Sequence, residues 1–328
     1  MVFPVPCPDP ADEPGWDALL GDDAALAAGV AAICTRHGLD GRQAVRYDSG
    51  SLPVYAIGTA HVLKLFPPHE GSHAAIEART LAAVQGALSI PTPQLLAVDV
   101  VDGWHGVLMS QLRGRRLVDV WPALSTAQRD RMADELGSAV AALHAIDTAP
   151  LADFQPRWHE FVPMQRDSAV ERQRARRLDA HWLERLPEFL QTWMPPIEAR
   201  RSLLHTELMR EHLLVDADGT GCRLTGLFDF EPAMIGAPEY DFASLGLFVA
   251  CGDGRFLRRV LLAYGLRPDE LDSALQCRLM AHAMLHRYSN LRWYLERLPA
   301  PGATSLEQLA TRWWSFDTDA SSTHRKAT

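Results

Sequence analysis

The spacing of apolar residues changes at Gly114, and this change restricts the fold more than any other feature of the chain. Before Gly114, short apolar runs bounded by Gly, Pro and Asp are typical of strands, with one helical segment, Ala74–Gln85, among them. After Gly114, apolar residues recur mostly at helical spacing. The sequence therefore predicts an α+β fold with a small antiparallel-sheet N-terminal lobe and a larger, mainly helical C-terminal lobe. The predicted strands of the first lobe are Val45–Tyr47, Pro53–Ile57, His61–Phe66, Gln94–Asp99 and Gly106–Gln111.

The two predicted lobes comprise residues 1–112 and 113–318. The Pro-rich residues 1–14 and the tail 319–328 are predicted to be flexible. A further helix is predicted for Trp16–His37, with Gly38 at its C-cap. The helices predicted for the second lobe are Ala127–Ile146, Ser168–Leu186, Phe242–Val249, Asp253–Tyr264 and Asp269–Leu298. Between them, two β-like runs, Leu213–Val215 and Arg223–Phe230, flank the turn A-D-G-T-G.

Charge and composition exclude several classes of protein. The net charge of −9 disfavours a general nucleic-acid binder, because phosphate backbones require a basic surface, and it leaves cationic small molecules as partners. The five cysteines include no C-x-x-C pair, which is typical of a reducing compartment. The sequence contains neither a long apolar run nor a signal-peptide pattern, so it predicts a cytoplasmic protein without membrane attachment, either a monomer or a dimer.

The segment L-L-H-T-E-L-M-R-E-H-L-L-V-D, Leu203–Asp216, has the outline of a kinase catalytic loop. His205 precedes an acid, Glu207, by two positions, and His212 follows that acid by five. Kinase loops carry Asp and Asn at the last two places, so both residues are altered here. His205, Glu207 and His212 are therefore the candidate catalytic residues.

A lysine in an apolar strand is the second candidate feature. Lys64 lies in H-V-L-K-L-F and requires a partner, which Glu77 on the following helix is well placed to supply. In phosphoryl transfer such a lysine binds nucleotide phosphates while the helix carboxylate positions it. The alternative is a strand-edge lysine in contact with water.

Two further segments are candidates for metal and phosphate binding. Asp229 ends a strand in L-T-G-L-F-D-F-E, where a carboxylate is a natural magnesium ligand, although a solvated Asp is the simpler interpretation. The hairpin Y-D-S-G-S-L-P-V-Y could place Ser49, Gly50 and Ser51 over phosphates, but an ordinary turn explains it equally well. Residues His205–Asp241 contain eight acids and two bases, which suits a metal and a cationic substrate.

These segments occur in the order that a kinase requires, and together they resemble the aminoglycoside phosphotransferase and choline kinase family, over roughly Val45–Leu247. Further support comes from I-P-T-P-Q-L-L-A-V-D, from the hinge-like V-L-M-S-Q-L-R-G-R-R-L, from L-G-S-A-V-A-A-L-H-A-I, and from G-A-P-E-Y-D-F-A-S-L, which resembles the family's G-D-P-x-x-D-L-A. The resemblance implies a bilobal protein-kinase-like fold with the nucleotide between the lobes.

The resemblance also implies roles for individual residues. Lys64 would contact the nucleotide phosphates, Glu77 would orient Lys64, and Asp229 would bind Mg²⁺. Glu207 stands in the place of the catalytic aspartate, and His212 in that of the metal-binding asparagine. The remaining implied positions are Met109, Ser110, Gln111 and Leu112 for the adenine site, Glu231 in place of the glycine after D-F, and Asp241 for support of the catalytic loop.

The predicted function is transfer of the γ-phosphoryl group of ATP or GTP, with Mg²⁺, to a hydroxyl of a small cationic molecule such as an aminoglycoside or hygromycin-like antibiotic. Because magnesium prefers oxygen to imidazole, Glu231 is predicted to compensate for His212 as a metal ligand. The altered loop leaves a pseudokinase, which binds nucleotide or ligand without efficient transfer, as the alternative. A third hypothesis, a zinc hydrolase, requires the segment between His205 and His212 to be helical.

Three basic or histidine-containing segments have structural interpretations. The run Arg172–Arg177 is predicted to be a solvated helix face, and His144 a packed or capping residue. The segment His282–Tyr288 is predicted to belong to a core helix, with the lining of an acceptor pocket as the alternative.

Overall fold

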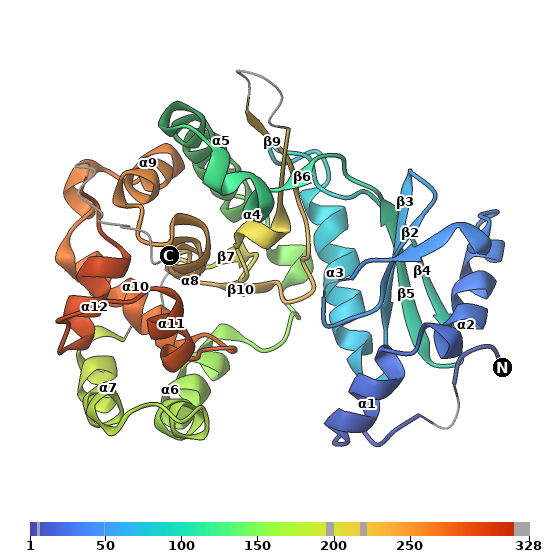
Figure 1. Cartoon of the computed structure of the whole chain (residues 1–328), viewed down its shortest axis with the longest axis horizontal. Coiled ribbons are helices and arrows are strands. Elements are labelled where there is room, and N and C mark those ends of the chain that lie inside the picture. The colour runs from blue at the N-terminus through green and yellow to red at the C-terminus, as the bar shows by residue number, and fades with distance from the viewer. Residues whose placement is uncertain (5–6, 49, 195–199, 217–221, 318–328) are drawn as a thin grey trace. The chain divides into compact units, whose positions relative to one another are not determined.

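The computed structural model describes residues 1–4, 7–48, 50–194, 200–216 and 222–317, which form two compact units (Figure 1). The first unit consists of Met1–Gly86, Pro91–Arg113 and Gly226–Pro232, and the second of Ala87–Ile90, Gly114–Thr225 and Ala233–Thr328. The predicted α+β class is confirmed. The predicted tail 319–328 and the turn A-D-G-T-G, residues 217–221, lie outside the described residues.

The first unit contains a five-stranded antiparallel sheet of order β1-β2-β3-β5-β4. Two tight turns explain the pairing: Gly58 has a φ of 62° between β2 and β3, and Asp102 and Gly103 have φ values of 51° and 85° between β4 and β5. A positive φ at both central residues gives the second turn the twist that suits a hairpin. The strands are β1 (Ala44–Arg46), β2 (Val54–Ile57), β3 (His61–Phe66), β4 (Leu95–Val101) and β5 (Trp104–Ser110).

Helices α2 (Asp23–Arg36) and α3 (Gly71–Val84) lie on opposite faces of this sheet (Figure 1). Leu63 and Leu65 belong to the buried cluster that packs against α2. Successive residues of a strand point to opposite faces, so Lys64, between these two leucines, points toward the face covered by α3. The alternation of β3 therefore fixes the direction in which its lysine points.

The N-terminal helix predicted for Trp16–His37 is two helices, α1 (Glu13–Leu20) and α2. The prediction of one helix is wrong because the Asp22 side chain accepts a hydrogen bond from Ala25 N and caps a new helix. Gly38 ends α2 as expected, with a φ of 68°. Although residues 1–14 are predicted to be flexible, Phe3 is buried and stacks on Trp104 at a ring-centroid distance of 5.1 Å.

The second unit is mainly helical, and its long helix α5 packs closely against α9. A Cβ atom at Gly137 of α5 would lie 2.3 Å from the Val260 carbonyl of α9, so glycine permits this approach. The α-helices are α4 (Leu117–Val120), α5 (Thr126–His144), α6 (Trp158–Ala175), α7 (Ala180–Trp193), α8 (Glu239–Ser244), α9 (Gly254–Tyr264), α10 (Ser273–Leu285), α11 (Leu291–Arg297) and α12 (Leu306–Trp313). A π-helical segment, Leu245–Ala250, continues α8.

Two small sheets accompany these helices. Strand β7 (Ser202–Leu204) pairs with β10 (Met234–Gly236), and β8 (Leu213–Asp216) lies between β6 (Arg115–Arg116) and β9 (Arg223–Leu227). Strand β9 ends at Leu227, three residues before the predicted end. The end of β9 and the segment that follows it, Gly226–Pro232, belong to the first unit.

Two long predicted helices are interrupted. The segment Ser168–Leu186 spans the end of α6 and the start of α7, with Arg177 in the left-handed region at a φ of 58° and Asp179 capping α7. The segment Asp269–Leu298 contains α10 and α11, and Asn290 between them caps α11 through Trp293 N. In both cases a residue that can cap a helix lies inside a continuous hydrophobic pattern, and the cap decides the boundary.

Among the described residues, no single helix has both the length and the apolar character needed to cross a membrane. The pair α1 and α2 reaches that length and composition together, with a bend of 64° between its members, and the match rests on nothing further.

Candidate active site

The side chain of Lys64 is bound by three carboxylates within the first unit. Its Nζ atom lies 2.7 Å from Glu77 Oε2, 2.6 Å from Asp229 Oδ1 and 2.9 Å from Glu231 Oε2. Lys64 is 7% exposed and Glu77 is 1% exposed, so the contact between them is shielded from water. We call these four residues the Lys64 cluster. The predicted pair of Lys64 and Glu77 is present, and the prediction of a solvated strand-edge lysine is wrong.

Glu77 also holds the chain segment that carries Asp229. Its Oε1 atom accepts a hydrogen bond of 3.3 Å from Phe230 N, while its Oε2 atom binds Lys64. Asp229 follows β9 with a φ of 73°, a conformation that is uncommon for a residue with a side chain. One buried carboxylate therefore connects strand β3, helix α3 and the turn after β9.

The charges of the Lys64 cluster do not balance. Burial opposes the charge of Lys64, but the fields of Asp229, Glu77 and Glu231 outweigh it and hold the Lys64 pKa well above its usual value. Burial raises the Glu77 pKa, and the charges of Asp229 and Glu231 add to that effect against the opposing effect of Lys64. One cation and three carboxylates leave a formal excess of two negative charges.

The donor atoms of this cluster suit a hard divalent cation. One carboxylate oxygen from each of Glu77, Asp229 and Glu231 lies within 4.8 Å of the others. Mg²⁺ prefers such oxygen ligands, and its charge equals the excess in the cluster. These residues therefore fit the metal that the resemblance implies.

The residues predicted to contact the nucleotide lie in the first unit. Met109 is buried and Ser110 half-buried at the end of β5, followed by the half-buried residues Gln111 and Leu112. The main-chain N–H of Gln111 donates to the Ala60 carbonyl at 2.8 Å. Gly50 has a φ of 120°, and both Gly50 and Ser51 are exposed, whereas Ser49 lies outside the described residues. Phosphate and adenine binding by these residues stay predictions.

In the second unit, Asp241 of α8 holds the start of the candidate catalytic loop. This carboxylate is fully buried and accepts hydrogen bonds from His205 N at 2.9 Å and from Thr206 N at 2.7 Å. His144 Nε2 lies 2.9 Å from the same carboxylate. Asp241, predicted to support the loop, thus holds two successive backbone amides by hydrogen bonds. His144, which the sequence suggested only as a packed or capping residue, is its third partner.

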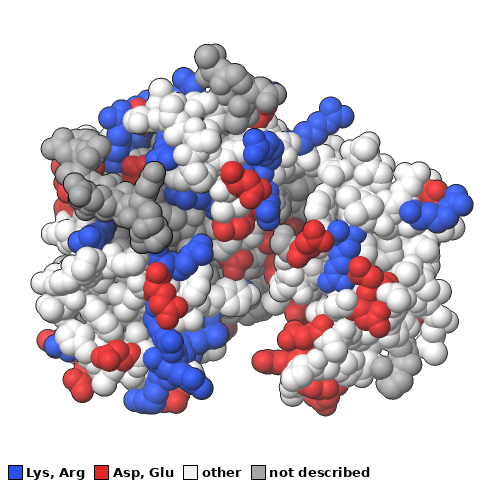
Figure 2. Space-filling view, viewed as in Figure 1, with Lys and Arg blue, Asp and Glu red and all other residues white. Residues whose placement is uncertain are grey.

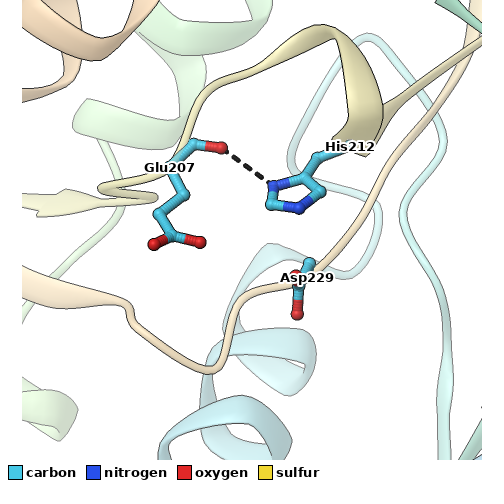
Figure 3. Close-up of side chains that lie close together, drawn as sticks. All are labelled: Glu207, His212 and Asp229. Carbon is cyan, nitrogen blue, oxygen red and sulfur yellow. Dashed lines mark hydrogen bonds between the residues drawn. The ribbon is translucent and has the colours of Figure 1, made fainter. Parts of the chain in front are cut away.

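The side chain of His212 folds back onto the loop that contains Glu207 (Figure 3). His212 Nδ1 lies 3.0 Å from the Glu207 carbonyl oxygen and donates to it, so in the neutral ring the lone pair is on Nε2. The loop then enters the short 3₁₀ helix Arg210–His212. Glu207 and His212 are both half-buried. We call residues His205–His212 the Glu207 loop.

The zinc-hydrolase hypothesis is wrong in its structural premise. Residues between His205 and Met209 are not helical, and only Arg210–His212 form a 3₁₀ turn. The two histidine side chains therefore do not share the face of an α-helix, which the zincin pattern requires.

Of the three structural interpretations, the packed His144 and the core helix are confirmed, and the solvated face is wrong for Arg172. Arg172 does not lie on a solvated face: its guanidinium donates to backbone carbonyls that include His286 O at 3.0 Å and Met284 O at 3.3 Å. His282 and His286 are buried in or directly after α10, which confirms the core helix. Figure 2 shows that basic side chains gather on one face of the second unit over the region of α6 and α11. Arg174, in this run, is exposed and pairs with Glu171.

The sequence model of the phosphotransferase enzyme family, APH, matches residues 43–275. The chain belongs to this family. Its members in the solved structures share the kinase-like architecture seen here, which confirms the predicted fold. No curated protein matches the chain in sequence.

Three solved structures illustrate the likeness. The GDP complex of aminoglycoside 2'-phosphotransferase-IIIa is 21% identical, with a TM-score of 0.65 over 85% of this chain and 95% of that one. The ternary complex of APH(2")-IIa with streptomycin and ATP is 17% identical, with a TM-score of 0.58 over 84% and 96%. Macrolide 2'-phosphotransferase MphH from Brachybacterium faecium is 22% identical, with a TM-score of 0.57 over 86% and 100%. At these identities the likeness concerns the fold alone.

Proposed function

We propose that this protein transfers the γ-phosphoryl group of ATP or GTP to a hydroxyl of a small cationic molecule, with aminoglycoside antibiotics as the first acceptors to test. The observation that carries the proposal is the position of Lys64, bound to Glu77 of α3 and to Asp229 after β9. In protein kinases the corresponding lysine, helix carboxylate and metal-binding aspartate must all be in place for catalysis. Membership of the phosphotransferase family supports the reaction class.

The acceptor class is inferred from charge and from the fold neighbours. Residues His205–Asp241 contain eight acids against two bases, which favours a cationic acceptor. Solved neighbours include a complex with GDP and kanamycin and a ternary complex with streptomycin and ATP. These observations favour an aminoglycoside over a neutral sugar and leave both nucleotides as donors to be compared.

In the proposed reaction, the Lys64 ammonium donates hydrogen bonds to the nucleotide phosphates, for which it exchanges one of its carboxylate partners. Asp229 and Glu231 would hold Mg²⁺ through carboxylate oxygens. Mg²⁺ supplies charge neutralisation on the phosphates when it is bound. The carboxylate that leaves Lys64 would then exchange one cation for another.

Glu207 accepts or orients the proton of the acceptor hydroxyl. The N-terminal side of its loop is fixed by Asp241, so the longer side chain of Glu extends from a fixed backbone. An additional methylene moves the carboxylate by roughly 1.5 Å relative to Asp. The bound acceptor must therefore lie correspondingly farther from the loop, which would restrict the acceptors that react.

Mass spectrometry tests the proposal directly. The purified protein is incubated with Mg²⁺, ATP or GTP, and a panel of aminoglycosides, amino alcohols and neutral sugars, beside two variants. Asp229→Ala should abolish the phosphorylated product, whereas Asp269→Ala, which removes an exposed carboxylate, should leave it unchanged. Nucleotide binding without any product would favour the pseudokinase, and an equally active Asp229→Ala variant would overturn the assignment of Asp229.

A further inference from the structure

We propose that His286 is a positioning residue for Glu207, which it controls through the peptide group that joins Thr206 to Glu207. The inference rests on the proposed function, because Glu207 has its role in that reaction. His286 directly follows α10 and lies about eighty positions after Thr206 in the chain. Its side chain is almost fully buried. Its Nε2 atom lies 3.1 Å from the Thr206 carbonyl oxygen.

Thr206 needs support from both of its peptide groups. Its φ of 71° lies in the left-handed region, where a β-branched residue is a genuine outlier. On one side, its N–H donates to Asp241 Oδ1 at 2.7 Å. On the other side, its carbonyl is bound by His286. Asp241 alone fixes only the first peptide group, and His286 fixes the second, which leads directly to Glu207.

The contacts of the ring determine which nitrogen carries the proton. The Tyr288 N–H donates to His286 Nδ1 at 3.2 Å, so Nδ1 is an acceptor and the proton is on Nε2. Nε2–H can then donate to the Thr206 carbonyl. Burial lowers the His286 pKa to about 4, which keeps the ring neutral near pH 7. Both ring nitrogens thus have the partner that the neutral tautomer requires.

Packing holds the ring in this orientation. Tyr240 stacks on His286 with centroids 5.0 Å apart and planes 19° apart, and Tyr240 is the neighbour of Asp241 in α8. Helix α8 therefore supports Thr206 in two ways. Its Asp241 binds the Thr206 N–H, and its Tyr240 orients His286, which binds the Thr206 carbonyl.

Helix α6 anchors the backbone of His286. The Arg172 guanidinium donates to the His286 carbonyl at 3.0 Å and to the Met284 carbonyl at 3.3 Å. The next residue, Gln173, donates to Ser289 Oγ at 2.9 Å and accepts from Leu291 N at 2.9 Å. The segment after α10 is therefore fixed to α6 on both sides of His286, so its ring is a rigid support.

Steady-state kinetics test the role with three substitutions. His286→Leu removes the donor, His286→Gln retains an N–H near the Nε2 position, and His282→Leu makes the same apolar change one helical turn earlier in α10. With an acceptor identified as above, His286→Leu should lower kcat about a hundredfold, because small misplacements of a catalytic group have effects of this size. The KM for nucleotide should stay within about twofold. His286→Gln should recover most of kcat, and His282→Leu should retain it.

A kcat of His286→Leu close to that of the unsubstituted protein would overturn the proposal. So would a loss that His286→Gln does not recover, or an equal loss in His282→Leu, because each would indicate a general effect on the fold.

Two measurements separate failure of this inference from failure of the proposed function, since neither needs an acceptor. The first is NMR spectroscopy of the unsubstituted protein with ¹⁵N-labelled histidine, which should show His286 as a neutral ring protonated on Nε2. Protonation on Nδ1 would overturn the proposal. Hydrogen exchange at the Glu207 and Leu208 amides should be faster in His286→Leu than in His286→Gln or His282→Leu. Equal exchange in all three would also overturn it, whether or not any acceptor is phosphorylated.

Discussion

The Lys64 cluster of the first unit is held by charge, because three carboxylates bind one ammonium. The Glu207 loop of the second unit is held instead through hydrogen bonds to its backbone N–H and carbonyl groups. The cluster has an excess of negative charge, so its partners can change when a cation or a phosphate arrives. In the loop, the N–H groups of His205 and Thr206 and the Thr206 carbonyl already have hydrogen-bond partners, which favours a fixed backbone. The proposed reaction thus combines an adaptable charged site with a fixed base.

The largest expected effect comes from removing a charge that the reaction uses. Asp229→Ala should lower phosphoryl transfer by at least about a thousandfold, similar to the loss of a strong electrostatic contact in other active sites. Circular dichroism should show an unchanged fold, since Asp229 is 28% exposed at its side chain. The check is the rate of product formation by mass spectrometry. A loss below about tenfold would mean that the other carboxylates suffice.

Removing the cation of the Lys64 cluster should lower stability as well as the proposed binding of nucleotide phosphates. Lys64→Met leaves three carboxylates without compensation and should lower the free energy of unfolding at pH 8 by about 3 kcal/mol. Burial already raises the Glu77 pKa, and without the opposing effect of the lysine that pKa rises further above its unfolded value. The unfolded state then releases protons more readily, so the destabilisation is largest above the folded-state pKa and shrinks as the pH falls.

Urea unfolding of Lys64→Met and of the unsubstituted protein at pH 8 and pH 5 measures this difference. We expect a smaller destabilisation at pH 5. The same destabilisation at both values would show that lost packing of the lysine, and not uncompensated charge, is responsible.

His286, which supports the Glu207 loop, should make the free energy of unfolding depend on pH. The His286 pKa is lowered to about 4 in the folded protein from 6.5, so between these values the unfolded state binds the additional proton. His286 therefore contributes stability that is complete above about pH 6.5 and is lost progressively as the pH falls toward 4. The loss by pH 5 corresponds to about 2 kcal/mol.

The comparison of His286→Gln with the unsubstituted protein isolates this contribution. From pH 7 to pH 5, the free energy of unfolding should fall by about 2 kcal/mol less in the variant than in the unsubstituted protein. Glu239, whose pKa lies at about 2, loses its stabilising charge only at lower pH, so it does not interfere. Parallel pH dependences of the two proteins would show that His286 is not buried as a neutral ring.

The smallest expected effect is that of Glu207→Asp, which tests whether the acceptor binds at the distance that the longer Glu207 side chain requires. In Glu207→Asp the carboxylate withdraws by roughly 1.5 Å on a backbone that Asp241 and His286 hold in place. We expect kcat to fall by about tenfold, with the KM for nucleotide unchanged. A gain in kcat would show instead that the site is built for the shorter acid.

The sequence predicted the parts of the fold that depend on local signals. Strand β3 has the predicted bounds, because its alternation and the turn at Gly58 fix it locally. The Lys64 and Glu77 contact was also predictable, since a lysine in an apolar strand needs an acid and a helix follows. Asp241 was found through the motif around it.

Other features depend on contacts between distant segments and have no local signal. Neither the bond from His286 to Thr206 nor the burial of Arg172 against carbonyls after α10 is visible in the spacing of residues. The helical patterns continue across Asp179 and Asn290, where a polar residue fits an exposed helix face as well as a cap. The positive φ of Thr206 is imposed by its partners and not by its side chain.

Thr206 and Asp229 both adopt backbone conformations that Gly or Asn would adopt more easily, and both lie in the segments to which catalysis is assigned. A side chain at such a φ costs backbone energy that Gly avoids, so Gly at either position should stabilise the protein at the expense of the proposed activity. A laboratory evolution experiment that rewards only heat resistance should therefore accumulate substitutions at these two positions. The selected variants would be more thermostable and less active, so these two positions mark a trade-off between stability and catalytic rate.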